Sequence, residues 1–193
     1  MNTTATDRII LGIDPGTNYM GYGVLQITGN NPSLVSLGIV DMHKFENHYL
    51  KLKHIYERTI QLIDGYNPDE LSIEAPFQGK NVQSMLKLGR AQGAAIAAAL
   101  SREIPIFEYA PKKIKSSITG NGNAAKEQVA AMLMKILRFS DMPKHLDATD
   151  GLAVALCHFY QSNVITAPSS YKNWEDFLRK NPDRIAKIGK NNS

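Results

Sequence analysis

The sequence predicts an α/β fold: a five-stranded mixed sheet with helices on both faces. The first observation is a series of three apolar, strand-forming runs joined by short turns, which is typical of an antiparallel meander. The second is that two further short apolar runs follow, each after a segment with helical periodicity. Such crossovers indicate parallel strands. The third is the length of 193 residues, which suits one compact domain with an appended tail.

The element boundaries follow from turn residues and from changes of period. Apolar runs bounded by glycine, proline or asparagine predict strands at residues 8–14, 19–27, 33–41, 70–74 and 104–108. Apolar residues at helical spacing predict helices at 46–63, 81–100, about 123–138 and 144–162, with Asn123 as the N-cap of the third helix.

This pattern divides the chain into three parts. We expect a flexible N-terminus at residues 1–7 and one compact α/β domain at 8–165. Residues 166–193 form a basic extension, where Lys and Arg outnumber acids six to three from Tyr171 to Ser193. The periodic pattern weakens there. Two alternatives remain for this extension: it is disordered, or it contacts DNA or a partner protein through residues such as Trp174.

Composition excludes several classes of protein. An apolar fraction of 43% and a charged fraction of 21% are ordinary for a globular protein. No apolar run reaches the roughly 18 residues of a membrane span, and the polar start lacks the apolar core of a secretory signal. The single cysteine, Cys157, excludes an internal disulfide. We therefore expect a cytoplasmic protein with no membrane partner.

The positive charge is concentrated in the middle of the chain. The net charge is only +4, yet the stretch from Lys80 to Lys126 holds eight Lys or Arg and two acids. A basic middle beside an acidic remainder indicates a polyanionic partner and a separate cation site. The alternative is that these side chains solvate helix surfaces.

Two acids, Asp14 and Glu74, stand where apolar strands end. A carboxylate near a core is costly unless it is paired or binds a metal. Ligands of α/β sheets gather at the carboxyl ends of strands, so we expect these two acids to meet in space. Alternatively, Asp14 is a turn residue before Pro15 and Glu74 is a surface acid.

A second acidic pair, Asp147 and Asp150, has i, i+3 spacing at the start of an apolar helix, which puts both on one face. Like charges there repel unless a cation bridges them. Carboxylate oxygens suit Mg²⁺ or Mn²⁺, and two metals about 3.5–4 Å apart can drive an in-line displacement on phosphorus. The alternative for Asp147 is a helix N-cap.

Four blocks of the sequence form an ordered set of motifs. They are residues 10–24 with Asp-Pro-Gly-Thr and Gly-Tyr-Gly-Val, 73–93 with Glu-Ala-Pro-Phe and Leu-Gly-Arg-Ala-Gln-Gly, 107–115 with Phe-Glu-Tyr-Ala-Pro, and 147–153 with Asp-Ala-Thr-Asp-Gly. Together these blocks resemble the RuvC family of bacterial Holliday junction resolvases. The similarity runs in order from about residue 8 to 162. The segment after about Val164 is longer than this family leads us to expect.

The resemblance implies a ribonuclease H-like fold and a homodimer that nicks two opposed strands of a four-way DNA junction during recombination and repair. It implies Mg²⁺, two ions per site, with Mn²⁺ as a substitute. The catalytic and metal-binding acids fall on Asp14, Glu74, Asp147 and Asp150. The junction-contacting aromatic falls on Phe77, and DNA-binding lysines fall on Lys115 and Lys126. RuvA and RuvB are the implied partners.

The sequence also suggests roles for several residues outside the acidic set. Phe77, in a loop with Lys80, suits stacking on bases, or else it belongs to the core. Lys112, Lys113 and Lys115 suit phosphate contacts, or else they are a solvated charge run. His145 and His158 fit ordinary surface or core positions better than proton transfer, and Cys157 fits the core.

Small residues recur every four positions at Gly89, Gly93, Ala97 and Ser101. They make a flat helix ridge suited to a two-fold dimer contact or to packing on the chain's own sheet.

Other functions share the first motif. Asp-Pro-Gly-Thr also resembles the first phosphate loop of actin-like ATPases and sugar kinases. Those proteins duplicate this domain, and no second Asp-x-Gly-Thr occurs here. A ribonuclease H-like nuclease that processes RNA is a further alternative, although it should lack the basic middle with Phe77. A junction-binding protein without catalysis fits poorly with four acids.

Overall fold

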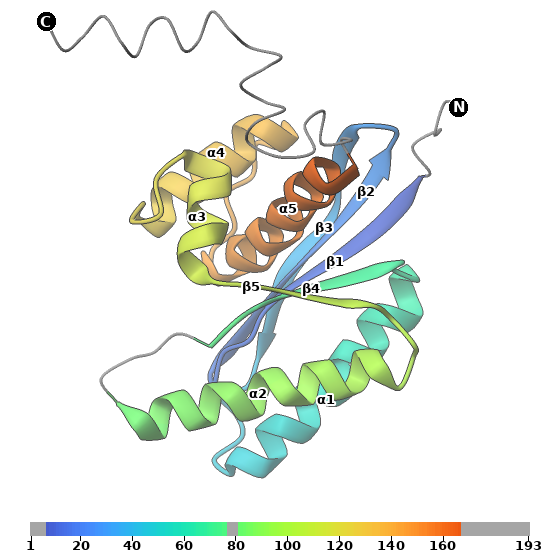
Figure 1. The fold of residues 1–193 in the computed structure, drawn as a ribbon. Coiled ribbons are helices and arrows are strands. Elements are labelled where there is room, and N and C mark those ends of the chain that lie inside the picture. The colour runs from blue at the N-terminus through green and yellow to red at the C-terminus, as the bar shows by residue number, and fades with distance from the viewer. Residues whose placement is uncertain (1–6, 77–80, 167–193) are drawn as a thin grey trace, which may run out of the picture. The chain divides into compact units, whose positions relative to one another are not determined.

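The computed structural model describes residues 7–76 and 81–166. Five strands and five helices lie in this part of the chain (Figure 1). In chain order they are β1 (Arg8–Asp14), β2 (Tyr19–Thr28), β3 (Asn31–Asp41), α1 (His48–Tyr66), β4 (Glu70–Glu74), α2 (Val82–Leu100), β5 (Ile106–Tyr109), α3 (Pro111–Thr119), α4 (Lys126–Leu137) and α5 (Asp147–Thr166).

The strands form one mixed sheet in the order β3-β2-β1-β4-β5. β1 pairs with β2 and β2 with β3 in antiparallel fashion, whereas β1 with β4 and β4 with β5 are parallel. The helices α1 and α2 provide the crossovers that parallel neighbours require. The predicted five-stranded mixed sheet is therefore confirmed.

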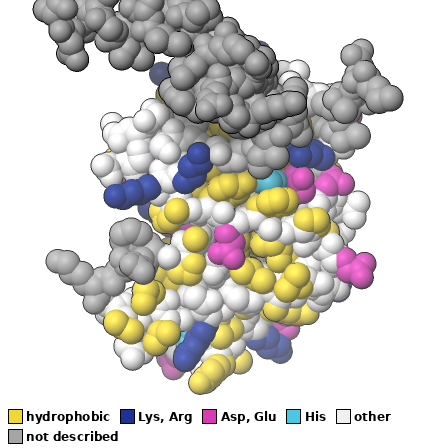
Figure 2. All heavy atoms as spheres, in the orientation of Figure 1, with side chains coloured by type: hydrophobic (Ala, Val, Ile, Leu, Met, Phe, Trp, Pro, Cys, Tyr) yellow, Lys and Arg dark blue, Asp and Glu magenta, His cyan; other side chains and the backbone are white. Residues whose placement is uncertain are grey.

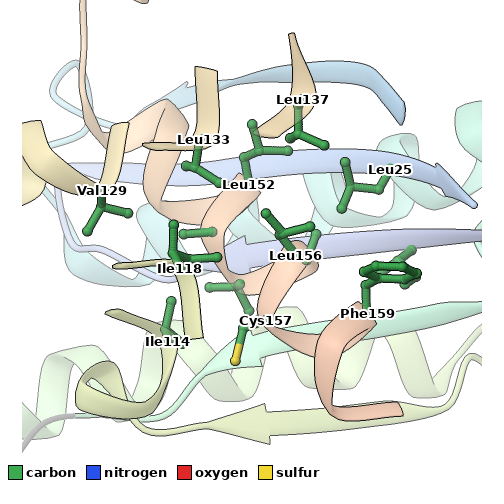
Figure 3. Packing of buried hydrophobic residues seen from close by; sticks show 14 of the residues in the cluster. Leu25, Ile114, Ile118, Val129, Leu133, Leu137, Leu152, Leu156, Cys157 and Phe159 are labelled. Carbon is green, nitrogen blue, oxygen red and sulfur yellow. The ribbon is translucent and has the colours of Figure 1, made fainter. Parts of the chain in front are cut away.

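Each face of the sheet has its own hydrophobic core. On one face, Ile10, Leu25 and Ile27 pack with buried residues of α3, α4 and α5, including Leu133 and Leu152 (Figure 3). On the other face, residues of the alternate strand positions pack against α1 and α2; they include Leu11, Ile13, Leu71 and Ile73 together with Ala91 and Ala95. The alternation of side chains along each strand therefore produces three layers, with the sheet in the middle.

Helix α5 lies unusually close to the sheet because glycines replace side chains at the contact. A Cβ atom built on Gly23 of β2 would lie 2.4 Å from the Cα atom of Leu152. A Cβ atom on Gly151 of α5 would lie 2.5 Å from the Cα atom of Tyr22. Both distances are shorter than any tolerated carbon contact, so this packing requires glycine on both surfaces.

Two details of the sequence prediction are wrong. Helix α3 was not predicted, although Pro111 stands at its first position and Ile114 and Ile118 are its buried residues. Asn123 is not the N-cap of α4, which begins at Lys126. The reason is that the side chain of Gln128 accepts a 2.9 Å hydrogen bond from the Ala125 N–H and so caps the helix from inside its first turn.

The predicted division of the chain is only partly covered by the described residues. Residues up to Gln161 belong to one compact unit and those from Ser162 onward to a second. Most of the predicted basic extension, with Trp174, lies outside the described residues, so its role stays a prediction. Within the described ranges, no helix has both the length and the apolar character needed to span a membrane.

We predict that Gly23→Ala destabilises the protein by about 1–3 kcal/mol, because the added methyl group collides with the backbone of α5. The matched control is Gly65→Ala in α1, where an added Cβ atom meets nothing within 4 Å. It should stabilise the helix by about 0.5–1 kcal/mol. Denaturant unfolding measures both, and equal effects of the two substitutions would contradict the close contact.

Candidate active site

Asp14 and Glu74 are the last residues of β1 and β4, two parallel neighbours. The register pairs Ile13 with Ile73, so the two acids follow side by side. Gly12 faces α5, because a Cβ atom there would lie 2.2 Å from the carbonyl oxygen of Gly151. Since side chains two residues apart share a face, Asp14 points into the same layer as α5. The predicted meeting of the two acids is confirmed.

Asp147 and Asp150 enter this layer from the first turn of α5. The register of β1 and β2 pairs Asp14 with Gly21. A Cβ atom on Gly21 would lie 1.9 Å from the carbonyl oxygen of Asp147. The start of α5 therefore rests directly beside Asp14, at the end of the sheet where β1 and β4 end (Figure 1). The predicted helical i, i+3 placement is also observed.

The charges of these carboxylates are held at an energetic cost. Burial, with the nearby carboxylates of Glu74 and Asp150, raises the pKa of Asp14 well above its usual value. Burial and the charge of Asp150 raise the pKa of Glu74 to about 7. Burial also raises the pKa of Asp150, although Lys126 opposes this. Raised pKa values of this kind are typical of functional sites, because such sites bring like charges together in a partly buried space.

Lys126 supplies the cation that partly offsets this repulsion. Its ammonium group donates a 3.1 Å hydrogen bond to Oδ1 of Asp147 and a second hydrogen bond to Oδ2 of Asp150. Burial alone would lower the pKa of Lys126, but the bonds to Asp150 and Asp147 outweigh it and raise the pKa. Its pairing with two predicted catalytic acids has no signal in the sequence.

A cleft of about 220 Å³ opens beside the acids. Its lining includes Asp14, Glu74 and Asp147 together with Pro15, Gly16, Tyr19, Ala75, Pro76 and Leu88. The Tyr19 ring lies 4.4 Å from the ring of His43 and 5.1 Å from that of His145. Tyr19 therefore belongs to the wall of the cleft, and His145 lies at its margin. In the sequence, Tyr19 stands out only as the start of a strand.

The donor set fits a hard divalent cation. The converging groups are carboxylates, whose mutual repulsion and burial a cation would relieve. Among the residues that the structure describes, no three acidic, histidine or cysteine side chains are already spaced to hold one ion. Lys126 contacts both aspartates of α5. A cation held by these carboxylates would compete with Lys126 for Asp147 and Asp150.

The predicted DNA-binding lysines lie at different distances from the acids. Lys115 of α3 is half-buried, and its charge lowers the pKa of both Glu74 and Asp150. Lys112 and Lys115 line a second cleft of about 320 Å³ with Pro111, Gly122 and Asn123. Lys113 is exposed on the same helix. Phe77 and Lys80 lie outside the described residues.

His158 belongs to a different place in the fold. It is 1% exposed, and its ring nitrogens contact Oε2 of Glu70 at 3.0 Å and the Tyr109 hydroxyl at 2.7 Å. Glu70 begins β4, whereas Glu74 ends it, so His158 lies away from the carboxylate cluster. Cys157 beside it is fully buried, as expected for a core residue.

The strand order and the α5 acids beside the ends of β1 and β4 define a ribonuclease H-like protein. A sequence model described as "Crossover junction endodeoxyribonuclease RuvC" matches residues 10–158. The chain belongs to the RuvC family.

Individual relatives agree with this assignment. The chain is 62% identical over 181 residues to the crossover junction endodeoxyribonuclease RuvC of Bacteroides fragilis, covering 93% of this chain and 96% of that protein. It is 58% identical over 184 residues to the RuvC of Porphyromonas gingivalis, covering 93% and 97%. The solved structure of T. thermophilus RuvC in complex with Holliday junction substrate superposes with a TM-score of 0.75 at 29% identity, covering 82% of this chain and 97% of that one.

The similarity reaches into the C-terminal tail. About 14 residues (7% of 193) lie outside the alignment with the Bacteroides fragilis protein. The chain after residue 166 is longer than that, so part of it has a counterpart there. The expectation that the tail exceeds the family pattern is therefore wrong for this relative, although the Thermus chain matches only 82% of the sequence.

We predict that Glu74→Gln stabilises the metal-free protein at pH 8 but not at pH 4. Folding raises the pKa of Glu74 from 4.5 to about 7, so its carboxylate costs stability as pH rises through that window. The expected gain is on the order of 2 kcal/mol. Denaturant unfolding at both pH values measures it, with Glu57→Gln on exposed α1 as the control. An equal gain at pH 4 would contradict this account.

Proposed function

We propose that this protein is a divalent-metal-dependent endonuclease that resolves Holliday junctions during recombination and repair by paired, symmetric nicks in opposed strands. The observation that carries the proposal is the carboxylate cluster of Asp14, Glu74, Asp147 and Asp150, which three separate elements bring to one end of the sheet. Membership of the RuvC family points the same chemistry toward branched DNA.

Asp14, Glu74, Asp147 and Asp150 would hold Mg²⁺, two ions per site, with Mn²⁺ as a substitute. The bound metal would supply an activated water and charge for the leaving oxygen in an in-line displacement. The protein's part is to orient the carboxylates and to hold them together out of bulk water. Lys126 contacts the two α5 aspartates, and a cation held by them would leave its ammonium free to contact a DNA phosphate.

DNA contacts would extend from this cluster along α3. Lys115 lies within electrostatic reach of Glu74 and Asp150, and Lys112 shares its cleft. Lys113 extends the positive charge on the same helix. Such contacts provide affinity and salt dependence rather than sequence recognition. For Phe77 and Lys80, which follow Glu74 closely in the chain, we keep the predicted stacking and phosphate contacts.

A homodimer would join two such sites through α2. The small residues of this helix do not pack on their own sheet: Gly93, Ala97 and Ser101 are exposed, and added Cβ atoms on Gly89 and Gly93 would meet nothing within 4 Å. Large apolar side chains on α2 are exposed too, namely Val82 (59%), Leu86 (47%) and Leu100 (62%). Figure 2 shows hydrophobic side chains gathered on this part of the surface. A flat, apolar helix face suits an isologous contact.

The same proposal places the protein in the cytoplasm with the chromosome. RuvA and RuvB, which act on the same junctions, are its proposed protein partners. The alternative of an ATP-binding domain predicts ATP hydrolysis without DNA, and we expect none.

We predict that Asp14→Asn or Asp150→Asn keeps junction binding but reduces nicking by at least about 1,000-fold, because the metal loses an anionic ligand. A synthetic four-way junction with Mg²⁺ measures cleavage on denaturing gels, and Ca²⁺ permits binding to be measured without cutting. Linear duplex of the same sequence is the control. Equal cutting of both substrates would contradict junction resolution, and retained cleavage by both variants would contradict the metal site.

We predict that Lys115→Ala weakens junction binding, because one phosphate contact is lost. The logarithm of the association constant should then fall less steeply with the logarithm of the salt concentration, with a slope smaller in magnitude by about 1. Binding titrations at several salt concentrations measure the slope. Lys53→Ala on α1, an exposed lysine paired with Glu57, is the matched control. An unchanged slope for Lys115→Ala would remove this residue from the DNA contact surface.

A further inference from the structure

Gln92 is the polar member of an otherwise alanine-lined helix face. The buried residues of α2 are Ala91, Gln92, Ala95, Ala98 and Ala99, and Gln92 is only 7% exposed. Its side-chain amide donates one hydrogen bond to the carbonyl oxygen of Glu74, at 3.3 Å, and one to Oε2 of Glu108, at 3.0 Å. The buried amide of Gln92 therefore binds the backbone of Glu74, a predicted metal ligand.

These contacts hold one peptide group at both of its polar atoms. The Glu74–Ala75 peptide offers the carbonyl of Glu74 and the N–H of Ala75. Gln92 binds the carbonyl, and the N–H donates a 2.9 Å hydrogen bond to the carbonyl oxygen of Tyr109 in β5. The plane of this peptide is thus fixed from α2 on one side and from the sheet on the other, at the point where β4 ends.

The position matters because Glu74 stands beside Asp14 where the parallel strands β1 and β4 end. Glu74 is the last residue of β4, and a strand end yields more readily than a strand centre. A displaced Glu74 would reach solvent and leave the cluster with Asp14. A fixed peptide plane restricts this escape.

We propose that Gln92 is a positioning residue that fixes the Glu74 peptide and thereby keeps the Glu74 carboxylate beside Asp14. The role rests on the proposed metal-dependent cleavage, in which Glu74 is a ligand. Gln92 contacts no reacting atom and acts only through Glu74. Groups that support a metal ligand in this way change metal affinity or activity by about 10- to 100-fold when they are removed.

The same residue links the site to the proposed dimer face. Gln92 directly precedes Gly93 on α2, and Gly93 lies on the exposed ridge of that helix. A partner docked on the ridge would therefore hold the helix that holds Glu74. Any test of Gln92 must accordingly separate positioning from dimerisation.

The test compares three variants. Gln92→Met keeps the length of the side chain and loses the donor. Gln92→Lys restores a donor of similar reach, beside the carboxylate of Glu108. Glu108→Ala removes the second partner of the same amide and leaves its bond to Glu74, so it is the matched control. The readouts are the Mg²⁺ concentration for half-maximal junction cleavage, kcat, junction affinity in Ca²⁺, oligomeric state and thermal unfolding.

We expect Gln92→Met to raise the Mg²⁺ requirement or lower kcat by about 10- to 100-fold, with junction affinity and oligomeric state unchanged. Gln92→Lys should recover much of this loss, and Glu108→Ala should behave like the wild type. Wild-type metal requirement and kcat for folded Gln92→Met would overturn the inference, as would equal losses for Met and Lys. A wild-type protein that cuts no junction at all would instead contradict the proposed function.

Discussion

The site depends on the close packing of α5 against β1 and β2. Glycines at Gly12, Gly23 and Gly151 let the helix backbone approach the sheet more closely than any side chain would permit. The same contact buries Leu152 in the core and brings the first turn of the helix beside Asp14. Packing and chemistry therefore depend on the same contact. A methyl group on any of these glycines would push α5 away from the sheet, and with it the buried side chains and the acids that this helix carries.

The cost of this arrangement is electrostatic. Three elements deliver carboxylates into a half-buried space, and the pKa values of Asp14, Glu74 and Asp150 rise because burial and mutual repulsion disfavour their charges. Two lysines offset part of this repulsion: Lys126, which lies on α4, and Lys115, which lies on α3. Proteins tolerate such local conflict mainly where function requires it. A divalent cation carries the charge that would resolve it.

The sequence was informative where local pattern determines position. Parallel strands end at one edge, and i, i+3 residues share a helix face, so the convergence of acids such as Asp147 was predictable. The ion pairs of Lys126 were not, because they depend on how α4 packs against α5. Pro111 is typical of a helix start and does begin α3, whereas Asn123 resembles an N-cap but the side chain of Gln128 caps α4 instead. Gln92 was hidden because its bond to a distant backbone carbonyl leaves no periodic trace.

Anomalous diffraction from crystals of the protein grown with Mn²⁺ would show whether the four carboxylates bind a divalent metal. We expect anomalous density among the carboxylates of Asp14, Glu74, Asp147 and Asp150, with the Lys126 ammonium moved off Asp147 and Asp150, the two aspartates that it contacts in the structure. Manganese bound only elsewhere, with Lys126 still joining Asp147 and Asp150, would contradict the assignment of this cluster as the metal centre.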